Sequence, residues 1–193
     1  MPDTQWTRFQ VFLQEKPGSP HLDMGSIHAP DKEMALLNAR DVFVRRPACV
    51  SLWVAPVQSI YSRTAQEIQE NGILSDTVEE LPAEKELYFV FGKLKPSGTQ
   101  TYLGTVEAAG ASQALETAME TLSPGKPVFA WWVIPARSVV KSDLADIESL
   151  FEPALDKPFR LSTDFHTVSA MRQIKSGKNE GETHPEDGAR HGN

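Results

Sequence analysis

The residues most able to do chemistry in this chain are five histidines, one cysteine and scattered carboxylates. A carboxylate-bridged di-iron site needs Glu-x-x-His pairs on helices, and no histidine here follows a glutamate by three residues. The phosphate loop G-x-x-x-x-G-K-[ST], the dinucleotide fingerprint G-x-G-x-x-G and the nucleophile elbow G-x-S-x-G do not occur either. The sequence therefore indicates no catalytic residue, no metal site and no cofactor site.

Two histidines lie close together along the chain. His21 and His28 are seven residues apart at the ends of a predicted strand, a spacing that points them to opposite faces and does not suit a shared metal. We therefore interpret both as surface or interface histidines.

Four charged residues are candidates for contact with a partner or an anion. Arg45 and Arg46 could bind a phosphate-bearing ligand such as a coenzyme A tail, because guanidinium groups make bidentate contacts to anions. The alternative is that they complement the negative end of the helix before them. Arg40 and Asp41 fall on the exposed side of that helix, where charged residues are usually only solvated. Together with His28, these four residues form the candidate interface or anion-binding set.

The stretch from Met24 to Asp41 positions these residues. It predicts a strand, a turn capped by Asp31 and an amphipathic helix that ends before Pro47. The buried stripe of this helix is expected to contain Ala35, Leu36, Ala39, Val42 and Phe43. Strands are predicted before it at Arg8 to Gln14 and Leu22 to His28, with a bulge at Gly25, and after it at Val50 to Ala55. The unit is β-β-α-β. The polar segment Gln58 to Glu70 that follows is predicted as a short helix.

The whole unit occurs twice. An offset of 79 positions aligns Arg8–Ile60 with Leu87–Val139 without a gap, and thirteen of the 53 pairs are identical. Chance would give roughly three or four identities, so this is a duplication. We expect an α+β fold of two tandem β-β-α-β repeats packed as an intrachain pseudo-dimer, with antiparallel sheets and helices on one face. The expected segments are a first repeat at 6–74, a linker at 75–85, a second repeat at 86–174 and a disordered tail at 175–193.

Composition excludes several functional classes. The net charge of −7 and the pI of about 5.2 disfavour nonspecific nucleic-acid binding. No apolar run is long enough to cross a bilayer, and the N-terminus lacks the pattern of a secretory signal. The lone Cys49 rules out an internal disulfide. We expect no membrane association and a cytoplasmic location.

The central stretch resembles a known family. The residues that carry the resemblance are Gly25–Ala29, Asp31, Glu33–Leu36, Asn38–Asp41, Arg45–Arg46 and Leu52–Val54, with Lys157–Arg160 and Thr163–Phe165 near the end of the second copy. They are similar to the B subunit of ring-1,2-phenylacetyl-CoA epoxidase, the PaaB family, whose members are usually single-copy. This chain resembles two such subunits fused. The second copy departs from the family pattern: Glu107 replaces His28, Met119-Glu120 replaces Arg40-Asp41, and the arginine pair is absent.

The resemblance implies a noncatalytic structural subunit of a bacterial multicomponent di-iron monooxygenase acting on phenylacetyl-CoA or a related aryl- or acyl-CoA. Its partners would be the oxygenase subunits, and it would carry no cofactor of its own. A different hypothesis is a stand-alone protein that binds an acyl-CoA or acidic ligand in the cleft between the repeats, lined by His28, Arg45 and Arg46. In either case the internal pairing would allow a monomer.

Overall fold

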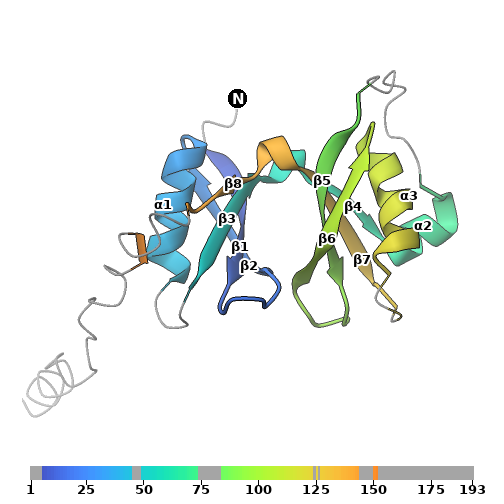
Figure 1. The fold of residues 1–193 in the computed structure, drawn as a ribbon, viewed down its shortest axis with the longest axis horizontal. Helices are drawn as coiled ribbons and strands as arrows, with labels where there is room; N and C mark the ends of the chain where they lie inside the picture. Colours follow the sequence, from blue (N-terminus) through green and yellow to red (C-terminus); the bar gives the residue numbers. More distant parts are fainter. Residues whose placement is uncertain are drawn as a thin grey trace, which may run out of the picture. The chain divides into compact units, whose positions relative to one another are not determined.

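The structure, a computed structural model, describes residues 6–44, 49–73, 84–123, 125, 127–143 and 150–151. The described residues form an α+β fold in which the strands join one antiparallel sheet, accompanied by helices α1, α2 and α3 (Figure 1). The first β-β-α-β unit consists of β1 (Thr7–Gln14), β2 (Leu22–Ala29), α1 (Lys32–Phe43) and β3 (Ser51–Pro56). The second consists of β5 (Glu86–Lys93), β6 (Gln100–Ala108), α3 (Ala111–Thr121) and β7 (Ala130–Pro135). These elements recur at the offset of 79 residues, within a residue or so at their ends.

Each unit continues beyond its last long strand. A 3-10 turn, η1 (Val57–Ser59), leads to β4 (Tyr61–Thr64) and α2 (Ala65–Asn71), and η2 (Ala136–Ser138) leads to β8 (Val140–Lys141). One short helix was predicted from Gln58 to Glu70, and this was wrong for the part before Ala65, which contains η1 and β4. The helical half begins at a capping box, in which Thr64 and Glu67 satisfy each other's backbone N–H groups.

The strands join one eight-stranded sheet in the order β4-β7-β5-β6-β2-β1-β3-β8. We expected separate sheets, but Leu22 of β2 pairs with Thr101 of β6 and so connects the two halves. Beside this pair, the backbone N–H of Tyr102 donates to the carbonyl of His21 at 2.9 Å. The repeats therefore share backbone hydrogen bonds as well as side-chain contacts.

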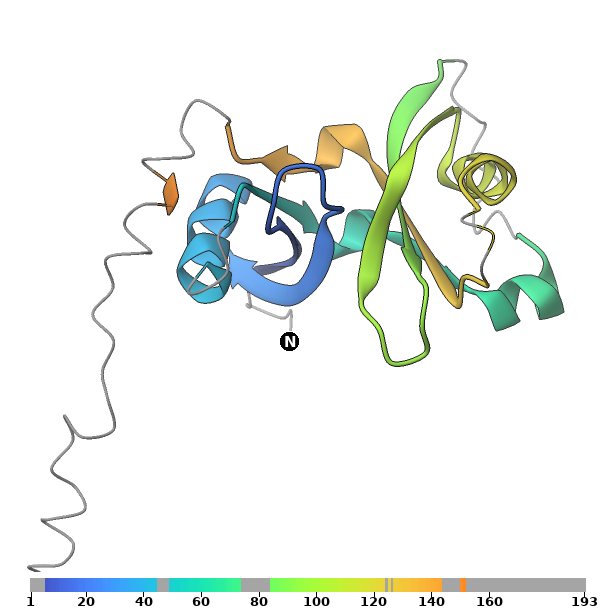
Figure 2. The ribbon, with the colours of Figure 1, turned by 60° about the horizontal axis from the view of Figure 1, so that its bottom comes forward.

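The segments after β3 and β7 each pair with the other repeat. Strand β4 pairs with β7, with Tyr61 opposite Val133, and β8 pairs with β3, with Val140 opposite Val54. Figure 2 shows the chain crossing from β3 through β4 to α2, beside β7. Ile68 of α2 joins the core under α3, while Val140 joins the core under α1. Each repeat is thus completed by the chain that follows the other.

The sheet has a core on each face. Helix α1 contributes Ala35 and Ala39 to one cluster, and α3 contributes Ala114, Leu115 and Ala118 to a second. A third cluster lies on the face without these helices and draws residues from both repeats: Phe12, Trp53, Ala55, Phe89, Phe91 and Ile134. Its centre is the stack of Phe12 on Phe91, with ring centroids 4.2 Å apart and both side chains fully buried. Phe12 is buried in this cluster, whereas its neighbours Val11 and Leu13 belong to the cluster under α1, so β1 is covered on both faces.

Local signals in the first unit are confirmed. Asp31 caps α1 by accepting a hydrogen bond from the backbone N–H of Met34 at 2.7 Å. The register of β1 against β2 shifts between Val11 and Phe12, opposite Gly25, which has a φ of 117°. In the second repeat, the register of β5 against β6 shifts at the corresponding place, opposite Gly104. The bulge therefore belongs to the repeated unit.

Gly25→Ala is expected to lower the free energy of unfolding by about 1–2 kcal/mol, because a residue with a Cβ rarely adopts this backbone conformation. The space at the site is not the obstacle, since a Cβ there would lie 3.7 Å from the ring of Phe43. Urea unfolding measures the change. The exposed neighbour Ser26 supplies the control, and an equal loss in Ser26→Ala would contradict the backbone explanation.

Candidate functional site

The predicted interface residues separate into two groups. His28 lies exposed on β2, and its carbonyl accepts a hydrogen bond from the Asn38 side chain at 3.4 Å. Arg40 and Asp41 form an ion pair on α1, with Arg40 Nη2 at 3.1 Å from Asp41 Oδ1. Arg45 and Arg46 lie outside the described residues. The structure therefore places three of the five predicted residues on or beside α1, where they contribute to its outer surface.

Helix α1 also exposes an apolar surface that the sequence analysis missed. Met34 is 41% exposed, Leu37 is 38% exposed and Val42 is 54% exposed. The assignment of Val42 to the buried stripe was therefore wrong, because the helix needs only Ala35 and Ala39, with Leu36 and Phe43 partly buried, to cover its strands. Met34, Leu37 and Asp41 are spaced i, i+3 and i+7, so they share one side of α1. Val42 is five residues from Leu37 and lies about 140° round the helix from it. We call Met34 and Leu37, which share one side, the α1 apolar face.

The corresponding positions of α3 are polar. At the offset of 79, Met34, Leu37 and Val42 correspond to Gln113, Glu116 and Thr121. The buried positions are retained, since Ala114 and Ala118 match Ala35 and Ala39. Both helices therefore pack on the sheet in the same way, but only α1 presents large apolar side chains outward. A comparison of the exposed helix positions in the two copies of the sequence would have shown this difference.

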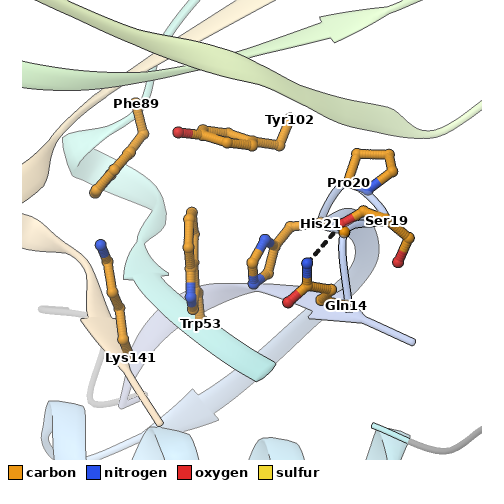
Figure 3. Close-up of a pocket in the computed structure, with 9 residues that line it drawn as sticks. Gln14, Ser19, Pro20, His21, Trp53, Phe89, Tyr102 and Lys141 are labelled. Atoms are coloured by element: carbon orange, nitrogen blue, oxygen red, sulfur yellow. Dashed lines mark hydrogen bonds between the residues drawn. The ribbon is translucent and has the colours of Figure 1, made fainter. Parts of the chain in front are cut away.

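A second candidate site is an open pocket of about 500 Å³ between the two repeats (Figure 3). It lies beside the β1–β2 turn and is lined by residues of both repeats: Gln14, Gly18, Ser19, Pro20, His21, Trp53, Phe89, Tyr102 and Lys141. The structure thus has a pocket between the repeats, as predicted, but the described residues that line it do not include His28, and Arg45 and Arg46 lie outside the described residues.

Aromatic rings form the walls of the pocket. The ring of Trp53 lies 5.0 Å from that of Phe89 and 5.4 Å from that of Tyr102, measured between centroids. His21 stacks on the other side of Trp53 at 3.7 Å, and its Nε2 is 3.0 Å from Ser51 Oγ. His21 is only 6% exposed, so its interpretation as a surface histidine was wrong, although it does lie where the repeats meet.

Among the described residues that line the pocket, Lys141 is the one cationic side chain. Lys141 of β8 places Nζ 4.2 Å from the centroid of the Phe89 ring and 4.6 Å from that of Trp53, which are cation–π distances. Burial lowers the pKa of Lys141. Burial, together with the charge of Lys141, lowers the pKa of His21 from 6.5 to about 4. At neutral pH the histidine is therefore neutral, and Lys141 supplies the positive charge of the pocket.

The other features of the described chain add no reactive group to either site. Cys49 is buried, its Sγ donates weakly to the carbonyl of Ser51, and burial raises the pKa of its thiol to about 11, so it is a poor nucleophile at neutral pH. Within the described ranges, no group of three or more His, Cys, Asp or Glu side chains is placed to hold a metal ion. Across the same part of the chain, no helix combines the length and apolarity that spanning a membrane requires.

Comparison with known proteins gives the family. The model described as "Phenylacetic acid degradation B" matches residues 5–76 and again residues 84–172. The chain belongs to the PaaB family. A PaaB relative, the B subunit of 1,2-phenylacetyl-CoA epoxidase from Escherichia coli (strain K12), is 38% identical over 88 residues, which are 46% of this chain and 84% of the relative. No solved structure matches significantly. The recognition made from Gly25–Ala29, Asp31 and the α1 residues is thereby confirmed.

Both candidate sites lie within the two segments that match the PaaB model, 5–76 and 84–172. The α1 apolar face belongs to the first segment, on the helix whose residues carried the resemblance in the sequence. The pocket is lined by residues of both segments.

Proposed function

We propose that this chain is a noncatalytic assembly subunit of a multicomponent di-iron monooxygenase that acts on phenylacetyl-CoA or a related aryl- or acyl-CoA. Membership of the PaaB family supports an epoxidase subunit. The observation that carries the assembly role is the α1 apolar face, because large exposed apolar side chains ringed by charged groups are typical of protein interfaces. Its occupant would be an oxygenase subunit. Arg40, Asp41 and His28 would lie at its polar rim, with Arg45 and Arg46 following α1.

We further propose that the two repeats act as a pseudo-dimer within one chain, so that the protein can function as a monomer. The exchange of β4 and β8 between repeats supports this, since each repeat borrows a strand from the other. A single-copy relative would need a second chain for the same contacts. The boundaries that go with this proposal are 6–74 and 86–174 for the repeats, 75–85 for the linker and 175–193 for the tail. The first repeat would make the outward contact, and the second would complete the fold. The lone cysteine is compatible with a reducing compartment such as the cytoplasm.

The double variant Met34→Glu/Leu37→Glu is expected to weaken binding to the oxygenase subunits at least about tenfold, because two carboxylates would be buried in an apolar contact. The helix itself should tolerate the change. Glu116 already occupies the position of Leu37 in α3, and an acidic residue in the first turn of a helix is favourable. Biolayer interferometry with purified oxygenase subunits measures the affinity, and circular dichroism checks the fold.

The matched control is Gln113→Glu, which together with the natural Glu116 gives α3 carboxylates at the same two positions as the double variant has on α1. Gln113 accepts a hydrogen bond from the backbone N–H of Ala109 at 2.9 Å through its carbonyl oxygen, and a carboxylate can replace that acceptor. This variant should bind as the parent protein does. Equal losses in the α1 and α3 variants would argue against a contact made by α1.

A further inference from the structure

The pocket between the repeats combines three aromatic rings with a single ammonium group. We propose that it is a binding site for a small aromatic carboxylate, whose ring would contact Trp53, Phe89 and Tyr102 while its carboxylate pairs with Lys141. The site is separate from the α1 apolar face and does not depend on the assembly role. It would make the chain a binding protein in addition to a structural one.

The aromatic walls define the uncharged part of the ligand. Trp53, Phe89 and Tyr102 come from β3, β5 and β6 and pack against one another, with centroid separations of 5.0 to 6.1 Å. Together they form one aromatic wall of the pocket, and a flat ring can pack against the edges of such a wall. The volume of about 500 Å³ falls in the range of small-molecule sites. Trp53 is itself held by the stack with His21, so one wall is already positioned before a ligand arrives.

Lys141 defines the charged part. None of the described residues that line the pocket is acidic, and no described carboxylate lies within 4 Å of the Lys141 ammonium group. The group is partly withdrawn from water and rests on two ring faces, which compensate only part of the lost hydration. A ligand carboxylate would complete that compensation. A phosphate ester is a poorer fit, since one lysine and a neutral histidine offer a single positive charge.

The fold does not require this set of side chains. At the offset of 79, the counterparts of Phe89, Tyr102 and Lys141 are Gln10, Asp23 and Ser62. Gln10 donates a hydrogen bond to Asp23, so the two polar side chains satisfy each other. The same backbone positions therefore fold with polar residues in one copy and with an aromatic–cationic set in the other. Trp53 and Phe89 also belong to the third core cluster, so the feature that packing does not require is Lys141 beside their rings.

Isothermal titration calorimetry of the full chain with 2-naphthoate and benzoate tests the proposal. Saturable binding is expected, with the backbone amides of Gly18 and Ser19 shifting in ¹⁵N–¹H spectra because these residues line the pocket. The neutral 2-naphthamide should bind about tenfold more weakly, as expected for the loss of one partly desolvated charge pair. Cyclohexanecarboxylate should also bind more weakly, since it keeps the charge and lacks the flat ring.

Lys141→Met keeps the apolar stem and removes the charge, so it should lower 2-naphthoate affinity about tenfold and leave 2-naphthamide unchanged. Lys95→Met, on the exposed β5–β6 turn, is the control and should bind 2-naphthoate as the parent does. Lys141 is exposed enough for the variant to fold, which thermal melting verifies. The proposal is overturned by an absence of saturable binding or by equal affinities for the acid and the amide. It is also overturned if Lys141→Met binds 2-naphthoate as tightly as the parent does.

Discussion

Replacing Phe91 with alanine is expected to lower the free energy of unfolding by about 3–5 kcal/mol, the usual cost of deleting a fully buried aromatic ring. Phe91 is 0% exposed and stacks on Phe12 of the other repeat at 4.2 Å. The cavity would therefore open in the cluster that both repeats share. We expect both repeats to lose stability together, in one transition seen equally by tryptophan fluorescence and far-ultraviolet circular dichroism during urea unfolding.

Phe129→Ala is the matched control, since Phe129 is 40% exposed and its deletion should cost about 1 kcal/mol or less. Two separate transitions in the Phe91 variant, or a loss as small as that of the control, would contradict a shared core. Cutting the chain near Thr77 gives a complementary test. Halves that stay apart and folded would count against the exchange of β4 and β8.

Acidification is expected to destabilise the protein through His21, by up to about 3 kcal/mol between pH 7 and pH 4. The pKa of this histidine is about 4 in the folded chain and 6.5 when unfolded. As the pH falls below 6.5 the unfolded chain binds a proton that the folded chain does not, so stability declines until the folded pKa is reached. The physical cause is burial against Trp53 next to the charge of Lys141.

His21→Gln should remove this component of the pH dependence. Glutamine is the residue at the matching position of the second repeat, Gln100, which is also buried. His28 is exposed and supplies the control, since His28→Gln should lose as much stability on acidification as the parent does. Because burial raises the pKa of Asp23, which titrates in the opposite sense, the informative quantity is the difference between variants measured by urea unfolding at each pH. Parallel pH profiles for the parent and His21→Gln would refute the assignment.

The sequence predicted those parts of the fold that local signals determine. The Asp31 cap and the glycine bulge depend on residues within one unit, and the duplication repeats those residues along the chain. The structure places the cap and both bulges as expected. Strand β4 was missed because Tyr61–Thr64 is polar and becomes a strand by pairing with β7, which lies far along the chain. Ser142 is buried and exchanges hydrogen bonds with the backbone of Leu52, again across the repeats.

The candidate sites were predicted less well for the same reason. Charged residues such as Arg40 and Asp41 stood out by type, and the structure does place them on the outer surface of α1. The apolar Met34 and Leu37 were overlooked because periodicity alone does not say which apolar residues a small helix leaves uncovered. The pocket residues come from strands far apart in the chain, so no local spacing could bring His21 and Lys141 together.

Co-purification tests the central claim most directly. The full chain, tagged and expressed in its native cells, is captured, and the recovered proteins are identified by mass spectrometry and assayed for iron. We expect an iron-containing oxygenase to be recovered with the parent chain and with Gln113→Glu, and to be lost with Met34→Glu/Leu37→Glu. Recovery of the chain alone and free of iron, under conditions where the oxygenase is present in the cells, would contradict the proposed assembly role.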